Sequence, residues 1–295
     1  MTASMRSVDA VCLRANWDYH ASPEKFMAWL ERLQQKGVRV LNKPDLVRWN
    51  FDKRYLLELR EKLVDGPAAT RGGSASAAGG DAARLHIPDV HVVDPRNTGA
   101  ITSLMAELGW EQAVLKSVSG QSGYHCHLIR RDQPVQWQEA AAAIPTAVAL
   151  LQAFQSDITT YSETVFVFFG GEFSHAVKRV VAKGQWQANA RYGAVPEVCA
   201  PSAAIIQQAR NVLQAAVPIG TPPPVYARVD GIVTPPSDGE GGGECLTLME
   251  LELIEPALYM DLATTCDSSV DAAAKFAETL EAALLGSASS DLKEQ

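Results

Sequence analysis

The sequence predicts an α+β protein, and three observations lead to that class. The chain opens with a short apolar run (8–13), a helical pattern and a second apolar run (38–41), which is the alternation of a β-α-β unit with parallel strands. Segments rich in aromatic and β-branched residues later predict longer strands. These strands cover residues 163–169, 225–233 and 246–254. An alanine-rich helical pattern over 270–285 then presents Phe276, Leu280 and Leu284 on one face.

The two early helices have recognisable start and stop signals. Ser22 as the N-cap and Pro23 in the first turn begin a helix that Gly37 ends. A second helix is expected to run from Asn50, as its cap, through Leu63.

Composition places the chain among globular proteins that bury a core, because 47% of its 295 residues are hydrophobic and 20% are charged. Lys and Arg number 26 and Asp and Glu number 34, which gives a net charge of −8 without a basic run. A nucleic-acid backbone requires clustered Lys and Arg, so we expect no nucleic-acid partner. No apolar stretch reaches the roughly 20 residues of a membrane span. With no secretory pattern at the N-terminus, we expect a cytoplasmic protein without a membrane partner.

Spacing and local composition say more about the organisation of the chain. The five cysteines are scattered, which favours reduced, buried thiols over a disulfide framework or a zinc–thiolate site. Residues 65–84 consist almost entirely of small and polar residues and predict a disordered insertion. Residues 234–243 lie between two strands and predict a long hairpin loop, and residues 286–295 predict a flexible tail.

The two strands on either side of this loop carry the strongest chemical signal. Strand side chains alternate between faces, so Glu250 and Glu252 share one face, and a hairpin brings Asp230 and Arg228 alongside. Neighbouring carboxylates repel one another, and a hard divalent cation offsets that repulsion, with oxygen ligands favouring Mg²⁺ over zinc. The alternative is a solvent-facing acidic strand edge that needs no metal. The flanking apolar residues favour a central strand, and with it the metal site.

Two lysines are candidates for contacts with phosphate. Lys53 lies near the start of a helix, and Lys116 ends an apolar run that leads into the Gly/Ser loop 119–124. A loop rich in backbone N–H groups beside a strand-end lysine suits phosphate oxygens. The alternative is a surface lysine and an ordinary turn, because the loop matches neither the Walker nor the Rossmann pattern.

Two further pairs are more simply explained as structural. His125 and His127 flank Cys126, but no third ligand of matching type lies nearby in the sequence, which argues against a metal site. Ser174 and His175 are neighbours on a predicted strand and point to opposite faces, which argues against a Ser–His relay.

Five sequence blocks carry a resemblance to a known family. They are LRANWDYH (13–20), LNKPDLVRWNFDKRYLLEL (41–59), GGEFSHAVK (170–178), YARVDG (226–231) and LMELELIEP (248–256). Their order resembles the ATP-grasp superfamily. More narrowly, it is similar to the glutathione-synthetase-like family that contains the bacterial cycloserine-forming cyclo-ligase, which acts on O-ureido-serine.

The resemblance implies an ATP-grasp fold, in which two α+β subdomains clamp a nucleotide. A truncated α/β unit over residues 1–45 would precede an ATP-grasp domain over residues 46–285. About residues 114–160 would form the small lid subdomain.

The resemblance also implies a nucleotide site. Lys53 and Lys116 would contact the phosphates and the adenine side, Glu163 would hold the ribose hydroxyls, and the Gly/Ser loop would close over the phosphates. The loop residues are Ser119, Gly120, Ser122 and Gly123, and the adenine hinge is Gln152, Ala153 and Phe154.

The reacting end of the site is implied in the same way. Asp230, Glu250 and Glu252 would bind one or two Mg²⁺ ions, although the pattern leaves open whether Glu255 replaces one of the two glutamates. The catalytic residues would be Arg228, Lys178 and Arg179, with Arg228 stabilising the transition state.

The implied reaction is an ATP- and Mg²⁺-dependent ligation of a small-molecule carboxylate to an amine through an acyl phosphate, between two molecules or within one. Such a step asks the protein mainly for positive charge and positioning. The alternatives are a catalytically weak or inactive nucleotide-binding paralogue that acts as a sensor or scaffold, and a phosphotransferase with the same fold. The sequence leaves open whether the chain is a monomer or a homodimer.

Overall fold

The computed structural model describes residues 8, 10–16, 18–65, 85–236, 243–266 and 271–285. The predicted insertion beyond residue 65, the middle of the predicted hairpin loop and the predicted tail lie outside the described residues. No helix among these residues has both the length and the apolar character of a membrane span.

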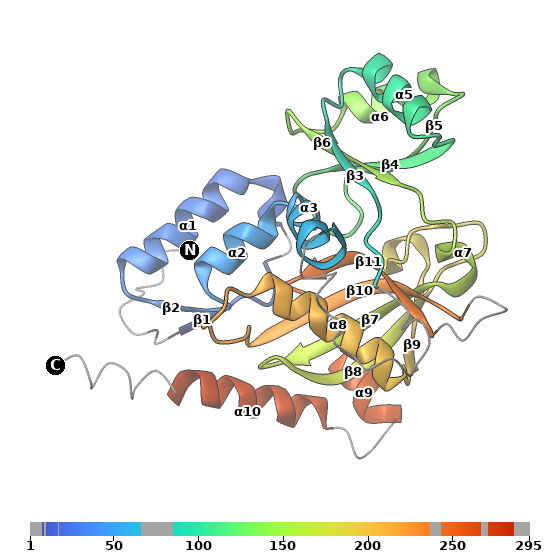
Figure 1. The fold of residues 1–295 in the computed structure, drawn as a ribbon. Helices are drawn as coiled ribbons and strands as arrows, with labels where there is room; N and C mark the ends of the chain where they lie inside the picture. Colours follow the sequence, from blue (N-terminus) through green and yellow to red (C-terminus); the bar gives the residue numbers. More distant parts are fainter. Residues whose placement is uncertain are drawn as a thin grey trace.

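The described chain forms three parts, each with its own sheet (Figure 1). The N-terminal unit contains a two-stranded sheet, the small subdomain a four-stranded sheet and the large subdomain a five-stranded sheet. The small subdomain lies at one end of the molecule, and the N-terminal unit packs beside the large sheet.

The N-terminal unit has the predicted β-α-β order. Strands β1 (Ala10–Cys12) and β2 (Arg39–Leu41) pair in parallel, and helix α1 (Pro23–Gln35) connects them after the 3-10 turn η2 (Tyr19–Ala21). Gly37 follows the helix in a left-handed conformation, with φ at +67°, which a glycine adopts without strain. The parallel strand pair predicted from the sequence is therefore confirmed.

The second predicted helix, from Asn50 through Leu63, is wrong as a single element. Helix α2 (Pro44–Phe51) ends before an extended Asp52, helix α3 (Tyr55–Arg60) follows, and a π-helical turn, η3 (Glu61–Asp65), completes the segment. Asn50 lies inside α2 rather than at a cap. Its amide group instead forms hydrogen bonds of 2.7 Å with the Leu251 carbonyl and 2.8 Å with the Leu253 N–H, so tertiary contacts set the helix boundary.

The small subdomain is a sheet with helices packed against it. Its antiparallel strand order is β3-β6-β4-β5, and Ile101, Leu115, Trp137 and Leu151 are among the buried residues between sheet and helices. The elements are β3 (Val90–Val93), α5 (Thr98–Glu107), β4 (Gln112–Ser117), β5 (Cys126–Arg130), α6 (Pro134–Ala142) and β6 (Ala149–Ala153). The sheet therefore begins at Val90, earlier in the chain than the expected lid range of about 114–160.

The large subdomain is built on an antiparallel sheet with strand order β11-β10-β7-β8-β9. Its central strand β7 is buried along its whole length, because α8 covers one face of the sheet and α10 the other (Figure 1). The strands are β7 (Glu163–Phe169), β8 (Glu172–Val180), β9 (Val195–Cys199), β10 (Tyr226–Thr234) and β11 (Cys245–Glu252). The other elements are α7 (Ile158–Tyr161), η4 (Ala190–Tyr192), α8 (Ala203–Ala216), α9 (Met260–Cys266) and α10 (Ala272–Leu285).

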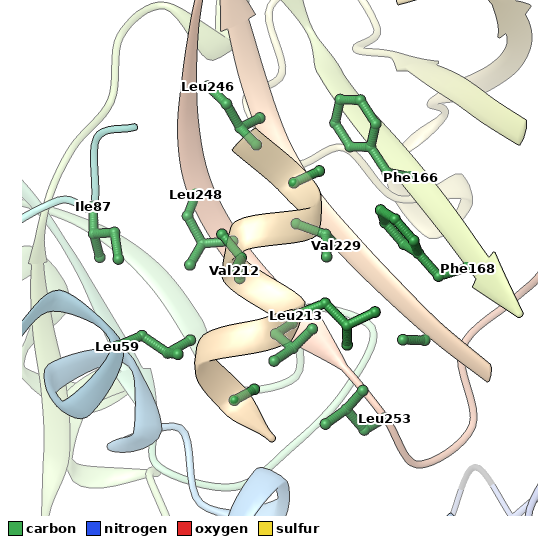
Figure 2. Close-up of a cluster of buried hydrophobic side chains, with 14 of the residues drawn as sticks. Leu59, Ile87, Phe166, Phe168, Val212, Leu213, Val229, Leu246, Leu248 and Leu253 are labelled. Atoms are coloured by element: carbon green, nitrogen blue, oxygen red, sulfur yellow. The ribbon is translucent and has the colours of Figure 1, made fainter. Parts of the chain in front are cut away.

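The main hydrophobic core lies between helix α8 and the sheet. Figure 2 shows Val212 and Leu213 of α8 facing Val229 and Leu248, with Phe166 and Phe168 of β7 completing the cluster. Burying a side chain of this size contributes roughly 1.5–3 kcal/mol. Because α8 and this core cover one face of the sheet, the polar residues lie on the opposite face, which is turned away from α8.

Strand β11 is the edge strand of its sheet, so the predicted central position is wrong. The apolar residues of β11 are instead explained by α8 on one face and by the His86 backbone and the Tyr55 side chain, which cover the strand's free edge. His86 bridges to Thr247, and the Tyr55 hydroxyl accepts a hydrogen bond from the Leu251 N–H at 2.9 Å and donates one to the Leu251 carbonyl at 3.0 Å. The edge is thus closed against solvent and against pairing with another strand.

Candidate active site

A cleft lies between the small sheet and the large sheet, with about 980 Å³ of empty space. This main cleft is lined by strands β4 and β6 of the small subdomain, by β7, β8 and β11 of the large one, and by the loop after β4. Two sheets that face each other across a cleft can hold a ligand between them.

Strand register places six charged residues of the large sheet on one face. Asp230 lies opposite Glu250, and Arg228 opposite Glu252, so the predicted hairpin alignment is confirmed. On the other side of β7, Glu163 lies opposite Arg179 of β8. These six residues occupy alternate positions along four strands, which brings them together on the face away from α8.

Asp230 is the centre of a buried ion-pair network. The carboxylate is fully buried and accepts hydrogen bonds from Arg228 Nε and Arg228 Nη2, both at 2.8 Å, and from Arg179 Nη2 at 2.8 Å. Arg228 also pairs with Glu252, and Arg179 pairs with Glu163. Each arginine therefore connects two carboxylates from neighbouring strands, and Arg228 also binds both oxygens of Asp230 through two nitrogens, the bidentate pairing for which a guanidinium is suited.

The two candidate phosphate-binding lysines both line the main cleft. Lys53 pairs with Glu250 of β11, and Lys116 Nζ donates a hydrogen bond to Gln152 Oε1 at 2.6 Å. Burial lowers the pKa of Lys53, but the charge and hydrogen bond of Glu250 outweigh it, so the pKa is raised. Burial and the charge of Lys53 lower the pKa of Lys116. The negative charge of an anion in the cleft would offset the positive charge around Lys116 and favour its protonated form.

Burial also shifts the pKa values of the carboxyl groups in the site. Burial, opposed by Arg179, raises the pKa of Glu163 to about 6, and burial, opposed by Arg228, raises the pKa of Glu252 to about 7. The pKa of Asp230 is lowered, because Arg228 and Arg179 together outweigh the effect of burial. Perturbed acids and bases in one cleft are typical of a functional site.

The Gly/Ser loop 119–124 forms part of the cleft wall and has an unusual backbone. Gly120, Ser122 and Gly123 have positive φ angles of 144°, 54° and 72°. Gly123 packs closely against Tyr192 of η4, since a Cβ atom built on Gly123 would lie 3.1 Å from the ring. Gly120, Ser122 and Gly123 line the main cleft, and Ser119 does not.

The predicted hinge residues Gln152, Ala153 and Phe154 also line the cleft. Phe154 makes an edge contact with Trp186, with ring centroids 6.1 Å apart. Trp186, Gln187, Ala188 and Asn189 form a wall that sequence reasoning missed. They lie between β8 and η4 without a periodic pattern, and Trp186 alone gave a signal, as an aromatic residue in a polar segment.

Besides Ser119, three predicted residues lie away from the surface of the main cleft. Asp230 and Arg228 lie beneath it in the ion-pair network, whereas Lys178 does not take part in that network. Lys178 precedes Arg179 on β8, so its side chain points to the other face of the sheet. The geometry thus joins Arg179 to the other candidates and separates Lys178 from them.

The donor atoms suit Mg²⁺, but in the structure arginine and lysine side chains balance their charge. Glu250 and Glu252 face the cleft with carboxylate oxygens, which are the ligands that Mg²⁺ prefers. Among the described residues, no group of three or more His, Cys, Asp or Glu side chains is arranged to hold a metal. To bind a metal ion, Glu250 would have to give up its ion pair with Lys53, and Glu252 its ion pair with Arg228.

A smaller side pocket, with about 340 Å³ of empty space that includes open solvent, adjoins the main cleft. The two share Lys53, Gly120, Gln121, Glu250 and Glu252. The remaining wall of the side pocket includes Tyr19, Phe51 and Glu255, which sequence reasoning did not assign to a substrate site.

Comparison with known proteins agrees with this geometry. Residues 2–42 match the family model "D-cycloserine synthetase DcsG, N-terminal domain". The cycloserine biosynthesis protein DcsG of Streptomyces lavendulae is 24% identical over 183 residues, which are 60% of this chain and 54% of that protein. The matched region thus spans little more than half of the curated relative.

Three solved structures resemble the whole chain. The crystal structure of D-cycloserine synthetase DcsG has a TM-score of 0.73 at 22% identity, covering 96% of this chain and 86% of that one. The D-alanine–D-alanine ligase of Bacillus anthracis has a TM-score of 0.57 at 14% identity, with 86% and 75% covered. The RimK domain ATP-grasp protein of Sphaerobacter thermophilus has a TM-score of 0.56 at 16% identity, with 92% and 81% covered.

The chain therefore has the ATP-grasp fold, as the five sequence blocks implied. Among proteins of this fold it is similar to D-cycloserine synthetase DcsG, in sequence over part of its length and in structure over nearly all of it.

Proposed function

We propose that the protein is an ATP- and Mg²⁺-dependent ligase that joins a carboxylate to an amine. One observation carries the proposal. The main cleft brings Lys53, Lys116 and Arg179 together with Glu250 and Glu252, between two sheets that come from distant parts of the chain. Cations beside acidic oxygen donors are what binding of a metal nucleotide requires.

The proposed nucleotide position follows from the charge distribution. Lys116 and the positive-φ loop 119–124 would bind phosphate oxygens, and Glu163 the ribose hydroxyls. Phe154 and Trp186 would pack against the adenine, with Gln152 to Phe154 as its hinge. Asp230, Glu250 and Glu252 would hold Mg²⁺, which when bound neutralises charge on the transferring phosphoryl group.

The reaction would proceed in two steps. A carboxylate oxygen attacks the γ-phosphorus, the bond to the β-phosphate oxygen breaks, and ADP leaves. The amine nitrogen then attacks the acyl carbon of the acyl phosphate, the bond from that carbon to the phosphate oxygen breaks, and phosphate leaves. Arg228 and Arg179 would stabilise the negative charge that develops in each step. We include small-molecule substrates and a cytoplasmic location in this proposal. It leaves open whether the protein is a monomer or a homodimer.

The names of the relatives suggest which substrates to test first. A curated relative takes part in cycloserine biosynthesis and a structural relative is a D-alanine–D-alanine ligase, so amino acids of both configurations form the first panel. O-ureido-serine is added because the sequence blocks resemble the family of the cyclo-ligase that acts on it. The assay is ADP release with Mg·ATP, with and without added amines. ADP release that depends on a carboxylate and yields an amide supports the ligase. No carboxylate-dependent release by a folded, ATP-binding protein contradicts it.

A second candidate, nucleotide binding without turnover, is favoured by the ion-pair network. Arg228 and Arg179 already neutralise Asp230, and Lys53 pairs with Glu250, so the carboxylates are satisfied without a metal. A thermal shift with Mg·ATP, measured beside ADP release over the same panel, separates the two candidates. A shift without ADP favours the second, and ADP without an amide product favours a phosphotransferase.

A further inference from the structure

The side pocket contains a buried carboxylate that the proposed nucleotide site does not use. Glu255 is 6% exposed and lines this pocket together with Tyr19 and Phe51. Among the described residues Glu255 forms no ion pair, in contrast to Glu163, Asp230, Glu250 and Glu252, which all do. A buried carboxylate without a cation is costly, and a cationic ligand group offsets that cost.

Tyr19 holds this carboxylate in place. The Tyr19 hydroxyl forms a hydrogen bond with Glu255, and its ring packs between Phe26 and Phe51, with centroids at 5.2 and 5.5 Å. Burial and the charge of Glu255 raise the pKa of Tyr19, so the phenol stays neutral and donates its proton to the hydrogen bond. The carboxylate keeps further lone pairs for a second donor.

The backbone around Glu255 is also fixed. Arg14 Nη1 donates to the Pro256 carbonyl at 2.8 Å, Arg228 Nη1 to the Ala257 carbonyl at 3.1 Å, and the Tyr226 hydroxyl to the Ile254 carbonyl at 2.9 Å. Three side chains thus hold three carbonyls next to Glu255 in the chain. The carboxylate is presented by a preorganised segment, as a binding group needs to be.

The charge of the side pocket determines which substrate it fits. Glu250, Glu252 and Glu255 line it. Lys53 pairs with Glu250 and Arg228 with Glu252, which leaves Glu255 as the carboxylate of this lining without an ion pair to any described residue. Such a pocket repels a carboxylate and attracts an amine. It also opens directly beside the proposed phosphate end of the main cleft, because Lys53, Gly120 and Gln121 belong to both.

We propose that the side pocket is the subsite for the attacking amine, with Glu255 accepting a hydrogen bond from the amino group and Tyr19 positioning Glu255. This inference rests on the proposed ligase function and adds to it the place where the second substrate binds. Burial and the charge of Glu252, opposed by the charge of Arg228, raise the pKa of Glu255 to about 8, which agrees with a buried carboxyl group outside any ion pair of the described chain.

The first test measures binding without turnover. n-Propylammonium and its neutral isostere 1-propanol are titrated calorimetrically into the full chain with Mg²⁺ and a non-hydrolysable ATP analogue. The wild type should bind n-propylammonium more tightly than 1-propanol, and Glu255→Gln should weaken n-propylammonium binding by about tenfold or more, the effect of a lost charged hydrogen bond. Equal binding of n-propylammonium by both proteins overturns the proposal.

Two matched variants and a folding control accompany this test. Glu139→Gln removes the same charge from an exposed position on α6 and should leave amine binding unchanged. Tyr19→Phe removes only the hydroxyl and should weaken amine binding less than Glu255→Gln. An unchanged thermal shift with Mg·ATP shows that each variant is folded and keeps its nucleotide site.

The second test uses the ligase reaction itself. Hydroxylamine is small and largely uncharged near neutral pH, and it traps an acyl phosphate as a hydroxamate. Glu255→Gln should raise KM for the amine substrate by about tenfold while hydroxamate formation and KM for ATP stay unchanged. An altered Mg²⁺ dependence with unchanged amine KM would make Glu255 a metal ligand and overturn the proposal. Failure of the ligase proposal is visible separately, as missing ADP release by a wild type that binds n-propylammonium.

Discussion

Arg179 of β8 and Asp230 of β10 form an ion pair across β7, with Arg179 Nη2 at 2.8 Å from Asp230 Oδ2. Asp230 is fully buried, and Arg228 contacts it as well. The Asp230 carboxylate therefore connects β10 with β8 across β7 on the polar face of the sheet. Because that carboxylate balances two buried guanidinium groups, its removal should be felt in both stability and function.

Asp230→Asn should lower the free energy of unfolding by about 3 kcal/mol, because it leaves buried arginine charge uncompensated. Urea unfolding monitored by circular dichroism measures this. Glu172→Gln is the control, since Glu172 pairs with Arg210 at 3.2 Å with an exposed carboxylate, and an exposed pair is worth about 0–1 kcal/mol. A cost for Asp230→Asn no larger than the cost for Glu172→Gln would contradict the network as described.

Stability should also depend on pH through Glu255. Its pKa of about 8 in the folded protein lies above its ordinary value of 4.5, so the folded state binds more protons than the unfolded state between these values. The contribution of Glu255 to the free energy of unfolding therefore falls as pH rises from about 4.5 to about 8 and changes little above that. The side chain of Glu255→Gln stays neutral, so the variant should escape this loss.

The measurement is urea unfolding of wild type and Glu255→Gln at about pH 5, 6, 7 and 8. The variant should gain on the wild type with rising pH, by several kcal/mol in total, because each unit of pKa shift corresponds to about 1.36 kcal/mol. Glu139→Gln, at an exposed position, should show no such trend. Parallel curves for wild type and Glu255→Gln would mean that Glu255 titrates normally.

Nucleotide binding should distinguish a lysine that lines the main cleft from one that does not. Lys116 lines the main cleft and bonds to Gln152, so Lys116→Ala should weaken Mg·ATP binding by about tenfold or more, as expected for a lost contact to a charged group. Lys178 lies on the other face of β8, so Lys178→Ala should leave the Kd unchanged. Titration calorimetry measures both. A larger effect from Lys178→Ala would restore it as a site residue.

Period-two alternation made the reacting end of the cleft predictable from sequence. Glu250 and Glu252 must share a face if 246–254 is a strand, and a hairpin must bring Asp230 near them, whatever the rest of the fold. The partner of Asp230 on the other side of β7 was harder to predict from the sequence. Arg179 reaches it only through the register of β7 with β8, which shifts at Val167/Phe168. Alternation does not determine such a shift, and Lys178 and Arg179 could not be separated.

Contacts between distant segments account for what the sequence did not reveal. Asn50 looks like a helix cap until its amide is seen on β11, and Tyr19 lies far in sequence from Glu255. The edge position of β11 was hidden for the same reason, because Tyr55 and His86 cover its backbone and permit an apolar composition. Local patterns record burial, but they do not record which element provides it.

The closure of the Gly/Ser loop can be tested with a matched pair of glycines. Gly123 and Gly109 both have a φ of +72°, so alanine strains the backbone equally at both, by about 1–2 kcal/mol. Their surroundings differ, because a Cβ atom at Gly123 would lie 3.1 Å from Tyr192, whereas nothing lies within 4 Å at Gly109. Gly123→Ala should therefore lose at least as much stability as Gly109→Ala in urea unfolding.

Only Gly123→Ala should also weaken Mg·ATP binding, by roughly threefold to tenfold, because the loop would have to move away from Tyr192 and hence from the main cleft. Calorimetric titration of both variants gives the comparison. Gly109→Ala measures the effect of backbone strain alone. The difference in Kd between the two variants therefore reports the effect of the loop position on Mg·ATP binding. Equal Kd values would show that the contact between Gly123 and Tyr192 does not set the loop position that binds phosphate.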